Sequence, residues 1–412
     1  MRVVIVGAGI AGLTLALELH DAGIECRVYE AAPEILPMGV GINVLPHATK
    51  VLGRLGLESA LAEVAVTTRE SVFYNRFGQM IYREPAGRFA GYSTPQFSIH
   101  RGELQTVLLQ AVRERLGSDA VVLGHVCHGA SQDERCATAH FRDPAGVALP
   151  AVRGDVVLAC DGVHSTIRKQ LHPEEGEPLY TGVNMWRGTT VMPPILTGAS
   201  MIRAGWLAGG KMVIYPIRDD VDGQGNQLVN WVAELQTERH ERRDWTRRAD
   251  VGDFLFAFET WRFDWLDVPE MVHHAGEVLE YPMVDQDPLG HWTVGRLTLV
   301  GDAAHPMVPR GSNGAGQAIL DAHALRTALV ECADPVAALR RYEEVRLPAT
   351  ARVVRTNRVR PPDAILREVW ERTGDRPFER IEDVISLSEL QGISDSYKEV
   401  AGYSRAQLAD PA

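Results

Sequence analysis

The stretch from Met1 to Glu30, MRVVIVGAGIAGLTLALELHDAGIECRVYE, decides how this chain folds. A β-branched run ends in three glycines spaced as GxGxxG, and apolar residues at three- and four-residue steps follow. This order predicts a strand, a tight turn and a helix from Ile10 to about Ala22. A second strand from Glu25 to Glu30 completes the unit.

Each glycine of the motif has a steric reason. Gly7 lets the chain turn off the strand, Gly9 removes a Cβ that would obstruct a pyrophosphate, and Gly12 lets the helix approach the sheet. Glu30 ends the second strand, where a carboxylate suits a ribose diol. The unit therefore predicts nucleotide binding, and FAD, NAD and S-adenosylmethionine are all possible ligands. The alternative is a tight glycine turn that binds no ligand.

Composition excludes several classes of protein. With 45% hydrophobic and 23% charged residues and no tract of 18 apolar residues, the chain of 412 residues reads as globular, without a membrane span. The net charge of −12 argues against nucleic acid or an anionic membrane as partner. Five scattered cysteines without a CxxC pair predict neither a disulfide framework nor a zinc site, and no signal peptide is evident, so we expect a cytoplasmic protein.

Two further buried strands end in glycine turns. The first leads into Asp161-Gly162, with Ser165 as a helix cap, and the second leads into Gly301-Asp302. The segment 311–316 then opens a helix to about Val330. An acidic residue at a strand end and glycines at a helix N-terminus can bind a polyol chain and polarise an electron-rich ring. The alternative is that this segment is a loop without a ligand.

Between these turns the pattern is that of a different domain. A hairpin is expected over 71–83 and strands over 184–191, 200–203, 211–217 and 227–235, without a ten-residue helical pattern between them. We also expect a strand over 120–126 and a helix over 252–261. The segment from Asp334 on is predicted helical, and it either covers the pocket or joins two subunits.

Three ordered motifs, Gly7 to Gly12 with Glu30, Cys160-Asp161-Gly162, and Gly301-Asp302 with Ala303-Ala304-His305-Pro306, resemble those of the single-component (group A) FAD-dependent aromatic monooxygenases. The resemblance extends to about Arg358. Segments 39–43, 98–105 and 185–188 are more narrowly similar to the branch of phenazine-1-carboxylate, salicylate and 3-hydroxybenzoate hydroxylases.

The family implies an α/β fold in which a Rossmann-like FAD-binding domain carries an inserted, mostly antiparallel substrate domain and a C-terminal helical segment. We assign residues 1–70, 98–175 and 278–333 to the FAD-binding domain, 71–97 and 176–277 to the substrate domain, and 334–412 to the helical region. NADH or NADPH would reduce FAD, and O2 would give a C4a-hydroperoxyflavin that hydroxylates an aromatic or heteroaromatic small molecule.

The resemblance also implies roles for individual residues. Pro306 would border the place where the substrate meets the flavin. Independently of the resemblance, a carboxylated aromatic substrate would require an arginine, which Arg187 or Arg310 could provide. Tyr215 is a candidate for the pocket wall. Arg310 departs from the small or apolar residue common there. The cofactor-binding residues would be Gly7, Gly9, Ala11, Gly12, Glu30, Gly41, Arg101, Val126, Asp161, Gly162, Arg168, Gly301, Asp302, Gly314 and Ala315.

Two other functions compete with this interpretation. An NAD-dependent dehydrogenase would use the first site alone and leave Gly301-Asp302 without a role. A non-catalytic FAD-binding module would hold flavin that NAD(P)H does not reduce, whatever aromatic is added. The sequence chooses neither between NADH and NADPH nor between a monomer and a homodimer.

Overall fold

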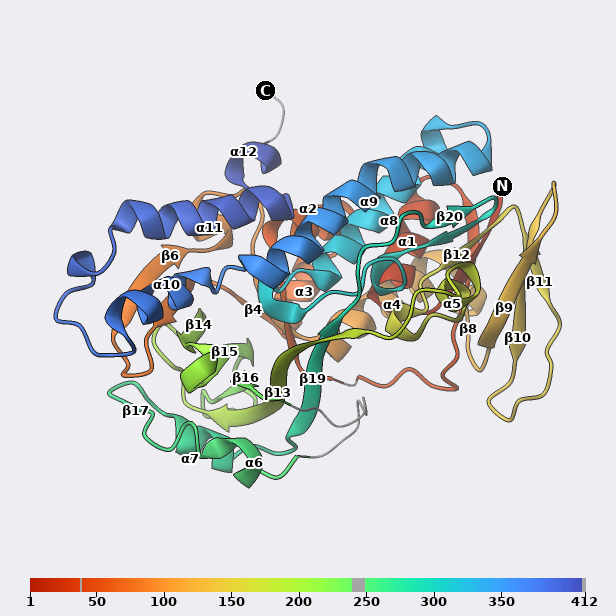
Figure 1. The fold of residues 1–412 in the computed structure, drawn as a ribbon. Coiled ribbons are helices and arrows are strands. Elements are labelled where there is room, and N and C mark those ends of the chain that lie inside the picture. The colour runs from red at the N-terminus through yellow and green to blue at the C-terminus, as the bar shows by residue number, and fades with distance from the viewer. Residues whose placement is uncertain (38, 239–248, 410–412) are drawn as a thin grey trace.

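A computed structural model describes residues 1–37, 39–238 and 249–409. Its two main sheets lie side by side, and long helices run over both of them (Figure 1). Within the described residues no helix is long and apolar enough to cross a membrane.

The N-terminal motif lies at the centre of a six-stranded sheet with the order β20-β21-β12-β1-β2-β8. Strands β8, β2, β1, β12 and β21 are parallel, and only β20 is antiparallel. Buried β-branched side chains fill β1 and β12, as a parallel sheet covered on both faces requires. The strands are β1 (Arg2–Val6), β2 (Glu25–Tyr29), β8 (Val121–Val122), β12 (Val156–Ala159), β20 (Thr293–Val294) and β21 (Leu297–Leu299).

Helices and two small sheets surround this sheet. The first helix packs against both the fourth and the eighth, and all three contribute to one apolar core. The helices are α1 (Ile10–Asp21), α2 (Pro46–Arg54), α3 (Glu58–Val64), α4 (Arg101–Leu116), α5 (Thr166–Leu171) and α8 (Gly314–Glu331). The small sheets are β3 (Gly41–Val44), β7 (Phe97–His100) and β4 (Ala65–Thr67), and β11 (Val152–Gly154), β10 (Ala137–Arg142) and β9 (Val126–Gln132).

The second main sheet has seven strands in the order β19-β13-β16-β15-β14-β5-β6, all antiparallel except the pair β14–β5. One of its faces packs on α6 (Gly252–Leu255) and α7 (Val268–His273), next to the hairpin β17 (Arg262–Phe263) and β18 (Leu266–Asp267). The seven strands are β19 (Leu279–Asp285), β13 (Leu179–Met192), β16 (Gln227–Gln236), β15 (Lys211–Arg218), β14 (Ser200–Gly205), β5 (Glu70–Tyr74) and β6 (Met80–Pro85).

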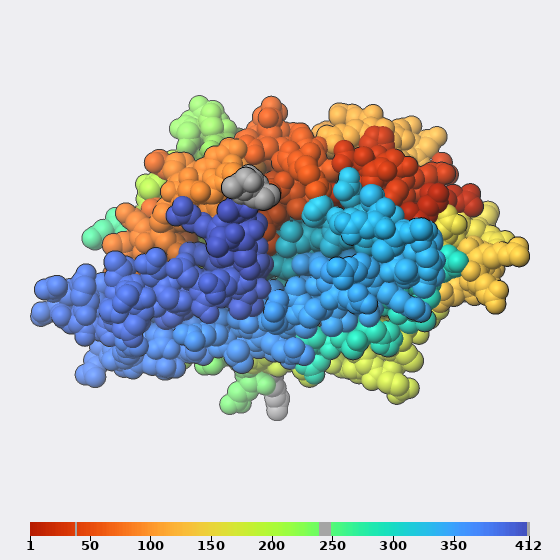
Figure 2. All heavy atoms as spheres, turned by 90° about the horizontal axis from the view of Figure 1, so that it is seen from above, coloured from red at the N-terminus to blue at the C-terminus, as the bar shows by residue number. Residues whose placement is uncertain are grey.

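The C-terminal part is helical, as predicted, and it spans both sheets. Helix α9 (Pro335–Val359) packs on α8, and α11 (Leu387–Ala401) packs on α9. The remaining helices are α10 (Ala364–Thr373) and α12 (Arg405–Leu408). Seen from above, the dark blue C-terminal helices lie directly against the orange segment that contains β5 and β6 (Figure 2).

The predicted α/β architecture with an inserted, mostly antiparallel sheet is confirmed, and three local predictions differ from the structure. Strand β19 belongs to the seven-stranded sheet, so the chain returns to the first sheet after Asp285 and not at residue 278. The expected strand 120–126 is two strands with a break at 123–125. The expected helix 252–261 ends at Leu255, because the next residues form turns that bury Phe258 and Trp261.

Candidate active site

The GxGxxG turn has the geometry that its spacing predicts. Gly7 has φ +101°, and a Cβ there would lie 2.5 Å from the Cys160 carbonyl oxygen. A Cβ on Gly12 would lie 2.0 Å from the Gly7 carbonyl oxygen, so only glycine allows α1 to start this close to β1. Gly9, in contrast, faces open space. Two of the glycines therefore serve the fold, and the third leaves room for a ligand.

Glu30 follows β2 directly, and its carboxylate is fixed by the backbone. The N–H groups of Ala8 and Ala32 donate to its Oε2 and Oε1 at 2.7 and 2.9 Å. The carboxylate thus links the end of the second strand to the glycine turn. Arg101 starts α4, and its side chain lies against Gly39.

The second and third turns present acids at the ends of parallel strands. Asp161 accepts a hydrogen bond from the Thr166 N–H at 3.0 Å, while its buried Oδ1 has no partner among the described residues. Burial raises the pKa of Asp161. Gly301 has φ +64° and leads into Asp302, which faces the cleft beside the start of α8 at Gly314. The surrounding protein also raises the pKa of Asp302, although His305 and Arg101 counteract this.

The three turns open into one cavity. Gly9 from the first turn, Gly162 from the second and Asp302 from the third all line it, and so do Pro306 and side chains of the seven-stranded sheet. The predicted site residues brought together here are Gly9, Ala11, Gly41, Arg101, Gly162, Arg187, Tyr215, Asp302, Pro306, Gly314 and Ala315. The cavity therefore lies between the two domains.

Seven predicted cofactor residues are not among those that line this cavity: Gly7, Gly12, Glu30, Val126, Asp161, Arg168 and Gly301. The three glycines shape the turns, and Asp161 is bonded within the second turn. Val126 is exposed at the start of β9, and Glu30 is held by the backbone as described. Arg168 is buried beneath the third turn, where its guanidinium donates to the carbonyl oxygens of Ala303 and Ala304 at 2.7 and 2.9 Å and to Glu175. Its contacts position the loop around Asp302, and it does not face the cleft.

A buried ionic network fixes the same loop from the other side. His305 Nε2 lies 2.5 Å from Oδ2 of Asp321, and Arg346 Nε donates to Oδ1 of Asp321 at 2.7 Å. The Gly301 N–H also donates to this carboxylate. Burial alone would raise the pKa of Asp321, but His305 and Arg346 hold it below its usual value. His305 is therefore a structural part of the loop.

The other half of the cavity is one face of the seven-stranded sheet. Side chains alternate along β15, so that Lys211, Val213 and Tyr215 face the cavity while Met212 and Ile214 face the core on α6 and α7. The same alternation points Trp186 and Trp231 into that core, away from the cavity. These two tryptophans thus pack the substrate domain.

Strand residues of this sheet hold the loop at Gly41. Asn230 Oδ1 accepts the Gly41 N–H at 2.7 Å, while Tyr215 Oη and Arg187 Nη2 donate to the Gly41 carbonyl oxygen at 2.8 and 3.0 Å. A Cβ on Gly41 would lie 2.7 Å from Ile217. Burial raises the pKa of Tyr215, with Arg187 opposing, so the phenol remains a protonated donor.

Sequence reasoning missed a buried charge cluster at the far end of the cavity. Lys211 Nζ contacts both carboxylate oxygens of Glu234 at 3.0 Å and also contacts Asp363, and Arg203 Nε lies 3.2 Å from Asp363. All four residues are buried. The alternation of side chains along β15 could have placed Lys211 on the same face of the strand as Tyr215. Its pairing with Asp363 could not be found this way, because the two residues are 152 positions apart.

Two arginines of the cavity have incompletely satisfied guanidinium groups. The buried Nε atoms of Arg187 and Arg310 have no hydrogen-bond partner among the described residues. Arg187 still donates to Gly41, whereas no ion pair or hydrogen bond of the Arg310 side chain is found in the described part of the chain. Burying an unpaired cation is costly, so an anionic ligand at this position would be stabilising.

Comparison with known proteins identifies the family. The chain matches the FAD binding domain family over residues 1–244 and 271–357. It is 40% identical to phenazine 1,6-dicarboxylic acid hydroxylase PhzS of Lysobacter antibioticus, over 98% of both chains. The chain is an FAD-dependent aromatic monooxygenase.

A further relative and a solved structure are consistent with this family. It is 34% identical to 3-amino-4-hydroxybenzoate 2-monooxygenase PtmB3 of Streptomyces platensis, over 99% of this chain and 97% of the relative. The fold is that of Klebsiella pneumoniae HpxO, solved with FAD and uric acid, with a TM-score of 0.75 at 22% identity over 99% of this chain and 96% of that one.

The monooxygenase uses FAD, with NAD(P)H and O2 as co-substrates. The cleft fits this cofactor, because Gly9 leaves space, Asp161 has a free buried oxygen and Asp302 faces a helix start. When bound, the flavin supplies the electron transfer and the oxygen chemistry. The chain's own residues bind it, orient the aromatic ring and exclude water.

Proposed function

We propose that this monooxygenase hydroxylates an aromatic or heteroaromatic acid, whose carboxylate binds Arg310 with help from Arg187. The observation that carries the proposal is that two arginines of the same cavity each have a buried Nε atom without a hydrogen-bond partner among the described residues. A guanidinium binds a carboxylate through two parallel hydrogen bonds. The names of several relatives, which specify a phenazine dicarboxylic acid, a hydroxybenzoate and a hydroxynicotinate, support the same substrate class.

We also propose roles for the other residues of the cavity. Gly9, Arg101, Gly162, Asp302, Gly314 and Ala315 contact FAD, and Pro306 borders the reacting ring. Tyr215 and Arg187 hold the Gly41 loop in place and line the substrate side. Glu30, Asp161 and Arg168 hold the three turns in the conformation that binds the cofactor. No base is assigned, because Tyr215 stays protonated and His305 is held by Asp321.

Arg310→Ala tests the proposal. For phenazine-1,6-dicarboxylic acid or 3-hydroxybenzoate, we expect KM to rise roughly 10- to 100-fold, because a charge-assisted hydrogen bond contributes about 1.5–3 kcal/mol. For the corresponding primary amide, KM should change little. The measurement is substrate-stimulated NAD(P)H oxidation with the hydroxylated product identified by mass.

Arg355→Ala on α9 is a matched control, because it removes an arginine that does not line the cavity. Equal changes in KM for the acid and the amide would contradict the role of Arg310. FAD that stays oxidised in the presence of NAD(P)H, whatever aromatic is added, would instead support the non-catalytic module.

A further inference from the structure

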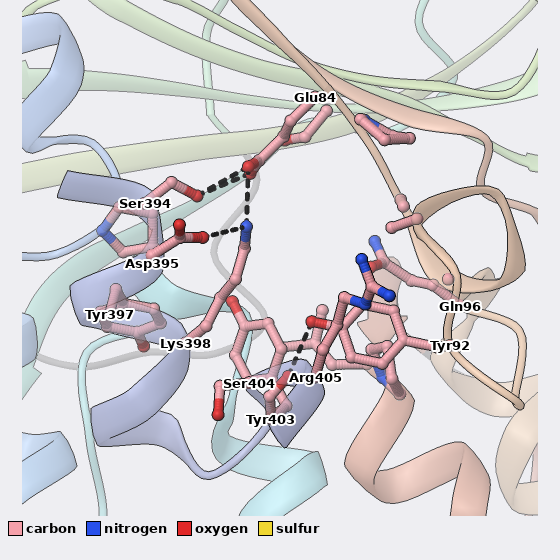
Figure 3. A pocket seen from close by; sticks show the side chains of 18 of the residues that line it. Glu84, Tyr92, Gln96, Ser394, Asp395, Tyr397, Lys398, Tyr403, Ser404 and Arg405 are labelled. Carbon is pink, nitrogen blue, oxygen red and sulfur yellow. Dashed lines mark hydrogen bonds and ion pairs between the residues drawn. The ribbon is translucent and has the colours of Figure 1, made fainter. Parts of the chain in front are cut away.

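A second cavity lies between the seven-stranded sheet and the C-terminal helices. Its volume is about 450 Å³, which is enough for a small molecule. Its walls come from β5, β6, the segment 85–96, α11 and α12 (Figure 3). Nothing in the proposed function gives this cavity a role.

The walls combine aromatic rings with polar contacts. Tyr82, Tyr92 and Tyr403 line the cavity, and the Tyr92 hydroxyl donates to the Tyr403 carbonyl oxygen at 2.8 Å. On the opposite side, Lys398 Nζ and Ser394 Oγ each donate to Glu84 at 2.8 Å (Figure 3). These few polar contacts join the C-terminal helices to the substrate domain. The neutral Tyr92 bond contributes about 0.5–1.5 kcal/mol, and each bond to the Glu84 carboxylate contributes about 1.5–3 kcal/mol.

A further hollow adjoins this cavity at α12. Tyr92, Arg405 and Ala406 line both this cavity and a second hollow of about 490 Å³. Arg405 is exposed, so a cation stands where the two spaces meet. An anionic aromatic compound would meet Arg405 and a tyrosine ring there.

The cavity also shares a lining residue with the reaction cavity. Arg203 lines both this cavity and the cavity that contains Tyr215 and Arg310. Its Nη1 donates to Ser71 Oγ at 2.6 Å, and its Nε lies 3.2 Å from Asp363. A single buried arginine side chain is therefore common to both spaces.

We propose that these adjoining cavities form the passage by which an aromatic carboxylate reaches the reaction site, and that Arg203, which stands between the last two of them, meets the carboxylate at the inner end. The substrate class rests on the proposed function. Bound FAD would occupy the side of the reaction cavity along Gly9, Asp302 and Gly314, which leaves the side lined by Arg203, Lys211 and Tyr215 for the aromatic compound.

The charge cluster allows Arg203 to exchange partners. Asp363 contacts both Arg203 and Lys211. If Arg203 turns to a substrate carboxylate, Lys211 still pairs with Asp363, and no buried charge is left alone. Phe73 lies 5.2 Å from the Arg203 guanidinium, so it offers an aromatic face on the same side.

Obstructing the passage tests the inference. Ala90→Trp and Ala406→Trp place a large ring on two different walls, and exposed Ala145→Trp, on the loop between β10 and β11, is the matched control. Rapid mixing of the FAD-loaded enzyme with phenazine-1,6-dicarboxylic acid or 3-hydroxybenzoate, followed through flavin absorbance, gives the rate constants of binding and release. We expect both to fall by about tenfold or more in each cavity variant, with Kd changed less than about twofold.

Three outcomes would overturn the inference. Unchanged rate constants in both cavity variants would show that the acid takes another route. A changed Kd with an unchanged association rate would show an indirect structural effect. If no aromatic acid of a wider panel perturbs the flavin absorbance of the unaltered enzyme, the proposed substrate class is wrong, and the passage is wrong with it. The first two outcomes, in contrast, contradict the passage alone, so the two failures can be told apart.

Discussion

The two sides of the reaction cavity are built in different ways. The cofactor side consists of backbone turns, in which glycines and strand ends set the shape. The substrate side consists of side chains that alternate on a sheet face and pair across long sequence separations. A site of the first kind depends on local conformation, whereas a site of the second kind depends on buried charges that must remain paired.

The charge cluster offers the largest test of this difference. Lys211→Met should destabilise the protein by about 3–5 kcal/mol, because it leaves Glu234 buried without a counter-ion. The measurement is the denaturant midpoint of the FAD-loaded enzyme. The double variant Lys211→Met with Glu234→Gln should recover much of the loss, since it removes both charges. A double variant as unstable as the single one would show that packing, and not charge pairing, dominates on the substrate side.

A glycine pair sharpens the comparison on the cofactor side. Gly12→Ala forces a Cβ against the Gly7 carbonyl and should destabilise the fold by about 1–3 kcal/mol. Gly9→Ala meets no protein atom, so its stability should be unchanged while its FAD content falls. Thermal unfolding of the apoprotein and the ratio of flavin to protein absorbance separate the two effects. Gly276→Ala, which also faces open space, is the control.

The smallest expected effect concerns pH. Desolvation of its carboxylate raises the pKa of Asp302, although the residue is exposed to the cleft, so its ionised form costs a little stability in the apoprotein. Asp302→Asn should therefore raise the apoprotein Tm slightly, by less than about 2 °C, at about pH 8. The gain should shrink as pH falls through the raised pKa toward the ordinary value, because aspartate then becomes neutral as well.

The same Asp302 variant should retain less FAD, so the effects on apoprotein stability and on cofactor binding have opposite signs. Exposed Asp264→Asn serves as the control and should change neither quantity. A gain in Tm that stays constant from about pH 8 to about pH 5 would contradict the role of the Asp302 charge.

Much of the cofactor side could be predicted because its signals are local. The positive φ of Gly7 and the close approach at Gly12 follow from residue identity and spacing within a few positions. Asp302 was placed by a strand end and a helix start, both of which hydrophobic patterns reveal. Arg168 shows the limit, because a motif position alone does not tell whether a side chain faces the ligand or supports the loop beneath it.

The substrate side could not be predicted in the same way because its contacts are distant in sequence. The hydrogen bond of Asn230 to Gly41 spans 189 residues, and no periodicity records such a pairing. The boundary at residue 278 put the residues of β19 in the FAD-binding domain for the same reason, since edge pairing with β13 depends on the tertiary fold. The C-terminal helices were predicted as helices, but the cavity beneath them appears only when α11 meets β6.

The Gly41 peptide has a mechanical consequence. Its N–H and its carbonyl oxygen are both hydrogen-bonded to side chains of the seven-stranded sheet, and the residue itself lines the cofactor cleft. An aromatic ring that displaces Tyr215 or Arg187 would also remove a hydrogen bond from the Gly41 carbonyl oxygen. The Gly41 peptide is therefore a direct link between the side chains of the substrate side and the backbone of the cofactor side.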